Sequence, residues 1–165
     1  MIAVADASVL IALSSLGRIE LLRERFPEGL VVPPAVWREV VEEGQGRAGA
    51  ETVRTADWIR LEQAADRDYI GLLSSTLDQG EAEAIALAHE RHADCVLLDE
   101  KAARLAAKQL GLRVLGAVGV LIWARRSGRL LNLSEELRRL REDVGFRLSD
   151  SVVQQALRHA GEDAH

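Results

Sequence analysis

Short apolar runs alternate along the chain with longer segments in which apolar residues recur every three or four positions. The short runs predict buried strands at residues 2–5, 30–32, 58–62, 95–98 and 112–115. The longer segments predict helices at residues 8–16, 18–26, 35–43, 50–56, 78–91, 100–110, 117–126, 134–144 and 149–159. Alternating strands and helices favour right-handed crossovers and a mainly parallel sheet covered on both faces. We therefore expect a three-layer α/β/α sandwich with four to five strands.

The length of the chain fits one domain. Its 165 residues can bury a core without disulfides, and the single cysteine, Cys95, excludes an internal disulfide framework. We expect one domain over residues 1–165, with the C-terminal helices (about 132–160) as a peripheral extension. The chain has neither a basic leader with a cleavage site nor a continuous apolar run of roughly eighteen residues. The prediction is a cytoplasmic protein with no membrane association.

Two aspartates directly follow predicted strands. Asp6 comes after residues 2–5, and Asp99 comes after residues 95–98. Aspartate at a strand end is often structural, because it starts turns and caps helices. In open α/β sheets, however, sites form at the carboxyl ends of the strands. Hard divalent cations bind several carboxylate oxygens that converge from different elements, so the two aspartates together indicate a metal site.

Four glutamates are further candidates, each with a structural interpretation. Glu39, in the predicted helix 35–43, has the pattern of a solvated position. Glu81 completes a capping box with Asp78, and that role would explain it fully. Glu83 lies two positions further on and should point elsewhere on the helix. Glu100 adjoins Asp99, so it is either another ligand or the start of a helix.

The segments around these acids resemble the PIN-domain nuclease family. The resemblance covers nearly the whole chain and rests on residues 4–13 (VADASVLIAL), 32–40 (VPPAVWREV), 77–88 (LDQGEAEAIALA) and 97–104 (LLDEKAAR). Residues 145–150 (GFRLSD) resemble the tail of a subgroup of uncharacterised prokaryotic PIN-like proteins related to toxin–antitoxin ribonucleases. Two departures are Glu81, where many PIN nucleases have Asp, and Ala7, where many have Thr.

The resemblance implies a site and an activity. The metal-binding and catalytic acids would be Asp6, Glu39, Glu81 and Asp99. Ser8 would lie near the metal or contact the substrate, Glu83 is a rival third acid, and Glu100 is a tentative addition. The implied activity is hydrolysis of RNA by an endoribonuclease dependent on Mg²⁺ or Mn²⁺, with a toxin-like role and a small antitoxin protein as partner. The alternative is a non-catalytic PIN-like module that binds RNA or protein.

The chemistry of phosphodiester hydrolysis suits these residue types. Carboxylates hold the metal, and the metal lowers the pKa of the attacking water and stabilises charge on phosphate oxygens. Carboxylates that share an ion should approach to about 4–5 Å between oxygens. A flavodoxin-like phosphatase is a weaker alternative. Such phosphatases begin with an Asp-x-Asp motif, and here Ser8 stands in place of the second aspartate.

Charge and apolar excess bear on the partners. The formal net charge of −5 argues mildly against a protein that wraps nucleic acid, although an acidic metal site would itself contribute several negative charges. Two arginine clusters, 125–129 and 138–141, are either solvated helix faces or a track for the RNA backbone. Residues 17–26 and the region of the third predicted helix (35–43) carry more apolar side chains than one side of a short helix needs, so we expect a two-fold homodimer.

Overall fold

A five-stranded, fully parallel sheet forms the centre of the molecule. The computed structural model describes residues 1–162. Within that range the strands are β1 (Ile2–Ala5), β2 (Gly29–Val32), β3 (Ile59–Leu61), β4 (Cys95–Leu97) and β5 (Val114–Leu115). Their order is β3-β2-β1-β4-β5, and every neighbouring pair is parallel. The predicted parallel sheet is confirmed.

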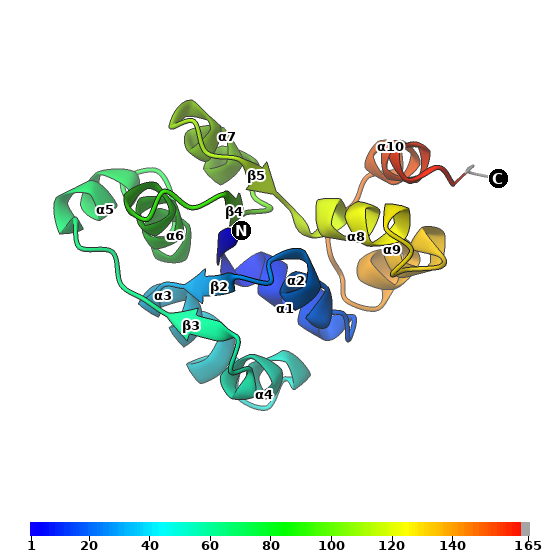
Figure 1. Cartoon of the computed structure of the whole chain (residues 1–165), viewed down its shortest axis with the longest axis horizontal. Coiled ribbons are helices and arrows are strands. Elements are labelled where there is room, and N and C mark those ends of the chain that lie inside the picture. Colours follow the sequence, from blue (N-terminus) through cyan, green and yellow to red (C-terminus); the bar gives the residue numbers. More distant parts are fainter. Residues whose placement is uncertain (163–165) are drawn as a thin grey trace.

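Helices connect successive strands and cover the sheet (Figure 1). They are α1 (Ala7–Ser15), α2 (Glu20–Arg25), α3 (Pro34–Trp37), η1 (Arg38–Glu42), α4 (Ala48–Thr55), α5 (Arg67–Leu73), α6 (Gln79–Glu90), α7 (Lys101–Gln109), α8 (Ala117–Arg126), α9 (Leu133–Glu142) and α10 (Asp150–Ala160). Here η1 is a π-helical turn. No helix within residues 1–162 is both long and apolar enough to cross a membrane.

Successive residues of β1 face two separate cores. Ala3 and Ala5 are completely buried in the larger apolar cluster, which includes side chains of α1, α2 and α8. Val4, between them, is buried in the other cluster together with residues of α6 and α7. Because neighbouring side chains of a strand point to opposite faces, the sheet lies between two helical layers. The expected α/β/α sandwich is confirmed.

The C-terminal helices share the larger core. Leu137 of α9 and Leu157 of α10 are buried in the same cluster as the residues of α1 and α2. In Figure 1, α9 and α10 lie beside α8, and α8 contacts both. Burial of these side chains removes apolar surface from water, so the two helices add to the stability of the fold.

Two segments differ from the prediction. The helix expected at residues 35–43 consists of α3 followed by the wider turn η1. Helix α5 was not predicted; none of its residues is fully buried, although Tyr69, Ile70 and Leu73 pack against the smaller core. Asp66 starts α5, since its side chain accepts a hydrogen bond from the Tyr69 N–H at 3.0 Å.

The apolar residues at 17–26 that suggested a homodimer lie inside the molecule. Ile19, Leu21, Leu22 and Phe26 are all buried in the larger core. They therefore offer no apolar surface to a second copy. The homodimer stays a prediction, without support from these residues.

A buried ion pair holds α9 against the segment between α1 and α2. Glu136 of α9 is only 4% exposed. Its carboxylate accepts hydrogen bonds from Arg18 at 2.6 Å and from Arg139 at 3.3 Å. Arg139 also donates to the carbonyl of Leu16 at 3.3 Å. Removing one cation leaves a buried carboxylate with fewer donors, which is costly.

We expect Arg18→Ala to destabilise the fold by roughly 1–3 kcal/mol, less than for a fully buried pair because Arg139 remains. For a domain of this size the melting temperature should fall by several degrees. Arg23→Ala is the matched control, since the exposed Arg23 lies 3.9 Å from Glu20 and such pairs contribute little. Thermal melts of both variants test this, and equal melting temperatures would contradict it.

Candidate active site

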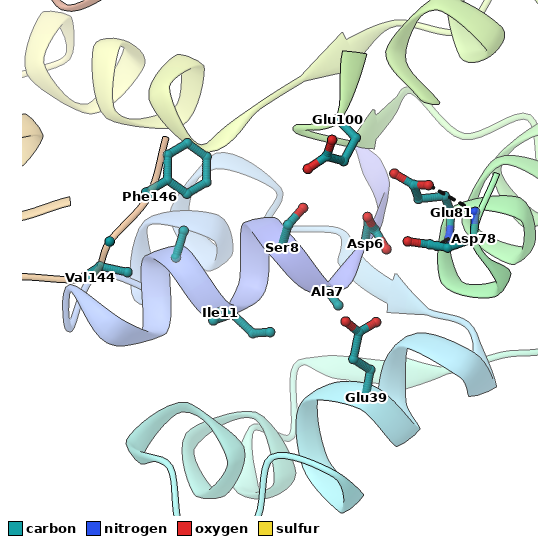
Figure 2. A pocket seen from close by; sticks show the side chains of 12 residues that line it. Asp6, Ala7, Ser8, Ile11, Glu39, Asp78, Glu81, Glu100, Val144 and Phe146 are labelled. Carbon is teal, nitrogen blue, oxygen red and sulfur yellow. Dashed lines mark hydrogen bonds between the residues drawn. The ribbon is translucent and has the colours of Figure 1, made fainter. Parts of the chain in front are cut away.

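An acid-lined cavity lies at the carboxyl end of β1 (Figure 2). The chain adds β2 and β3 on one side of β1, and β4 and β5 on the other. Open α/β sheets bind ligands where the strand order reverses in this way. The cavity has a volume of about 340 Å³ and is lined by Asp6, Ala7, Ser8, Ile11, Ala12, Glu39, Asp78, Glu81, Glu100, Val144, Gly145 and Phe146.

Asp6 is the most deeply buried acid of the cavity. It immediately follows β1, is 5% exposed, and donates its backbone N–H to the Leu97 carbonyl of β4 at 3.0 Å. Burial raises the pKa of Asp6 to about 7. The N–H of Ala7 lowers that pKa, whereas the nearby acids Asp78, Glu81 and Glu39 raise it. Asp6 therefore binds a proton near neutral pH when no cation offsets its charge.

Gly80 permits α6 to approach Asp6 closely. A Cβ atom at position 80 would lie 3.3 Å from an Asp6 carboxylate oxygen and 3.6 Å from Asp78 Oδ1. The first distance is tighter than most Cβ contacts, so a side chain would push these acids apart. The absence of a side chain at Gly80 thus keeps the N-terminal turn of α6 against the end of β1.

Glu81 divides its two carboxylate oxygens between two environments. Asp78 Oδ1 accepts from the Glu81 N–H at 2.8 Å, and Glu81 Oε1 accepts from the Asp78 N–H at 3.2 Å. This is the predicted capping box. Glu81 Oε2 is buried and has no hydrogen-bond partner among the described residues. Burial raises the pKa of Glu81, with a smaller opposite effect from the Asp78 backbone. The cap therefore explains only one oxygen.

Asp99 shows the same division. Its Oδ1 accepts from the N–H of Ala117, the first residue of α8, at 2.9 Å. Its Oδ2 is buried without a partner in the described part of the chain. Burial raises the pKa of Asp99, while the charge of Arg104 and the hydroxyl of Ser8 lower it. Asp99 is not among the residues that line the cavity, but it lies next to Ser8, which does.

Glu39 reaches the cavity from the π-helical turn η1. Its side chain is exposed and points toward Asp6 and Ala7 (Figure 2). Partial loss of solvent around its carboxylate raises the pKa of Glu39, and the charge of Asp78 raises it further. The solvated position expected from the sequence pattern is thus correct for its exposure, but the side chain still faces the acids.

The two candidates for the third acid, Glu81 and Glu83, line different cavities. Glu81 lines the cavity, whereas Glu83 faces a different cleft. Glu83 accepts from the N–H of Ala35 at 3.1 Å and from the side-chain amide of Gln79 at 2.7 Å. Glu100 lines the cavity and points toward Ser8 (Figure 2).

Asp78 was missed as a residue of the cavity. The sequence assigned it only to the cap of α6, and that role is correct. It also lines the cavity, and its charge raises the pKa values of Asp6, Glu39 and Glu81. The sequence did show an acid three residues before Glu81. Because the capping box explains that acid fully, it was not considered as part of the site.

The expected tight cluster of carboxylates is not formed. Within residues 1–162, no three acidic, histidine or cysteine side chains are close enough together to hold an ion. Like charges repel, and the exposed carboxylates of Glu39 and Glu100 are free to stay apart. The donor set nevertheless suits a cation, because Ser8 Oγ, Glu81 Oε2 and Asp99 Oδ2 are buried oxygens without hydrogen-bond partners in the described chain. Buried polar atoms are normally satisfied, and oxygens are the ligands of Mg²⁺.

Most arginines of the two clusters form ion pairs within the chain, mainly at its surface, whereas Arg126 forms none with a described residue; this favours their structural interpretation over an RNA track. Their ion pairs are Arg125–Glu162, Arg129–Glu24, Arg138–Glu135, Arg139–Glu136 and Arg141–Asp150. By contrast, Arg38 and Arg67 form no ion pair with a described residue, and both line the cleft that contains Glu83.

Comparison with known proteins places the chain in a family. A family model described as a PIN domain (DUF3368) matches residues 2–162. Among solved structures, the chain is similar to a PilT N-terminus domain protein, SSO1118, from the hyperthermophilic archaeon Sulfolobus solfataricus P2. The two are 18% identical with a TM-score of 0.47, over 80% of this chain and 96% of that chain. A search of curated proteins gives no match.

We expect Asp6→Asn to be more stable than the parent in chelator at pH 8. The folded pKa of Asp6, about 7, exceeds the ordinary value of 3.8. Burial of Asp6 therefore costs the parent protein no stability below about pH 4. Its free energy of unfolding falls as the pH rises from there through 7. The loss approaches about 4 kcal/mol at most, and asparagine avoids it.

Thermal melts from pH 4 to pH 8 in chelator measure this effect. The gain in melting temperature of Asp6→Asn over the parent should grow from near zero at pH 4 to several degrees at pH 8. Asp57→Asn, at an exposed position outside the cavity, is the control. A gain that is the same at every pH would contradict the assignment.

Proposed function

Because the chain belongs to the PIN-domain family, whose members are generally nucleases, we propose that it is a metal-dependent endoribonuclease that hydrolyses RNA phosphodiester bonds. The observation that carries the proposal is the buried Glu81 Oε2, which has no hydrogen-bond partner among the described residues, together with the buried Asp99 carboxylate oxygen beside the Ser8 hydroxyl. Such atoms cost free energy unless something binds them. A divalent cation would supply the positive charge that these carboxylate oxygens lack.

The acids have distinct positions for this task. We propose that Asp6, Glu39, Glu81 and Asp99 hold the metal, with Asp78 and Glu100 adding negative charge around it. Three of the four face the cavity, and the fourth, Asp99, is next to Ser8. When bound, Mg²⁺ or Mn²⁺ would lower the pKa of a water nucleophile and offset charge on the phosphate.

Other parts of the chain would bind and orient the RNA. The Ser8 hydroxyl lies beside Asp99 and lines the cavity, so it can also donate to a phosphate oxygen bound there. Arg38 is the first residue of η1, directly before Glu39, and forms no ion pair with a described residue, which suits it to a phosphate next to the one in the cavity. Burial of Asp6 and Glu81 excludes water from one side of the cavity and so strengthens charge interactions there.

The toxin-like role and its partner also belong to the proposal. Glu39 and Glu100 are exposed where they line the cavity. A small antitoxin protein that covered them would block access to the buried acids. The alternative is a module that binds RNA or protein without cleavage, and it differs from the enzyme in one measurable respect, metal-dependent cleavage.

Wild-type protein should cleave RNA with Mn²⁺ or Mg²⁺ and not in chelator. Glu81→Gln should abolish cleavage, because one ligand charge is lost while the amide oxygen can still accept from the Asp78 N–H. Glu83→Gln is the matched control: it also removes one charge from α6, but on the side away from the cavity. Gel analysis of labelled RNA measures both. Full cleavage by Glu81→Gln, or none by wild type, would overturn the proposal.

The variant Asp99→Asn distinguishes a role of Asp99 as a helix cap from a role as a metal ligand. Metal at a few times its Kd should stabilise wild type by about 1 kcal/mol, or roughly 2–4 °C. Asparagine can still accept from the Ala117 N–H and caps helices about as well as aspartate. We expect the variant to melt at or above wild type in chelator, and to lose most of the Mn²⁺-induced rise and all cleavage. An unchanged rise would remove Asp99 from the ligands.

A further inference from the structure

The cavity has two unlike sides. Acidic side chains occupy one side, and Ile11, Val144 and the ring of Phe146 occupy the other (Figure 2). Carboxylates are sufficient to hold a metal and position a phosphate. The apolar side is not needed for that chemistry, so it calls for an explanation of its own.

Phe146 is the only aromatic residue among those that line the cavity. The chain has two phenylalanines. The other, Phe26, is a core residue and 2% exposed. Phe146 is half-buried, so part of its ring remains accessible from the cavity. The buried part of the side chain packs against the larger apolar core, so Phe146 contributes to the core as well as to the cavity wall.

Backbone hydrogen bonds fix Phe146 in this position. The N–H of Val144 donates to the Arg139 carbonyl at 3.0 Å, and the N–H of Phe146 donates to the Leu140 carbonyl at 3.0 Å. Gly145, between them, has a φ of 81°, a left-handed conformation that favours glycine. The chain after α9 thus turns back on itself and places Phe146 at the cavity. The backbone that carries the ring is fixed before any ligand arrives.

We propose that Phe146 stacks on an unpaired base of the substrate, beside the phosphate bound by the acids. This inference rests on the proposed nuclease function. Proteins bind single strands by combining phosphate contacts with aromatic side chains on which bases stack. A base inside a duplex has both faces covered and cannot stack on the ring. Every base has a π face, so the contact selects unpaired nucleotides with little preference for sequence.

The test measures binding of a single-stranded RNA that carries one 2-aminopurine, with Mg²⁺ present and Asp6→Asn as the parent to prevent cleavage. Stacking on Phe146 quenches the fluorescence of this base. Phe146→Leu keeps the apolar bulk that the core contacts but loses the ring. It should weaken binding by roughly 5- to 150-fold and abolish the quenching. Phe146→Trp should retain both, and thermal melts verify that the variants are folded.

An abasic version of the same RNA is the second arm. If the ring contacts a base, Phe146→Leu should have no further effect on the binding of RNA that lacks that base. A structural role for Phe146 makes the loss of affinity equal for both RNAs. Equal binding of the intact RNA by the Leu variant and its parent, or equal losses on the two RNAs, overturns the inference.

Cleavage by the protein with Asp6 intact is measured separately, so the two proposals fail in different ways. Metal-dependent cleavage together with no effect of Phe146→Leu on binding overturns the stacking alone. Quenching that depends on Phe146, without cleavage by wild type, supports the stacking and overturns the nuclease.

Discussion

The whole arrangement depends on the burial of carboxylates where helices begin at one edge of a parallel sheet. All five strands point the same way, so α1 and α8 start near the edge where β1 and β4 end, and α6 starts against it. The first turn of a helix has unpaired N–H groups, and the acids supply acceptors: Asp78 and Glu81 for α6, and Asp99 for α8. Each such bond uses one oxygen. The second oxygens of Glu81 and Asp99 are buried without partners, and this ties the acidic site to the fold that surrounds it.

This division of oxygens explains why sequence reasoning could name the acids but not decide their role. The capping box at Asp78 and Glu81 was read correctly from its spacing, and it then seemed a sufficient reason for both residues. A carboxylate, however, can cap with one oxygen and bind a ligand with the other. Which of Glu81 and Glu83 faces the cavity depends on which side of α6 packs toward the end of β1, since residues two positions apart on a helix point more than half a turn apart. Local pattern does not contain that information.

The sheet was predictable because its strands are short apolar runs that face two cores, as Val4 shows between Ala3 and Ala5. Helix α5 was missed although Tyr69, Ile70 and Leu73 lie on one face and pack against the smaller core, because it is only seven residues long and contains Gly71, which weakens the helical signal. The spacing of the acids escaped for another reason. Glu39 and Glu100 are exposed, and the mutual repulsion of carboxylates opposes the tight cluster that a shared ion requires. The residue types of a site indicate which ligand it prefers. The distances between its carboxylates depend on whether a cation balances their negative charge.

Different forces hold the acids and Phe146 on the two sides of the cavity. The acids are held by the sheet and by helix N-termini, so their positions follow from the architecture common to open α/β folds. Phe146 is held by the turn after α9, and α9 is tied to the N-terminal half through Glu136 and Arg18. A change in α9 can therefore alter the apolar side while the acids stay in place. Metal chemistry and substrate preference would then depend on separate parts of the molecule, which allows the turn at residues 144–146 to change the preferred substrate without disturbing hydrolysis.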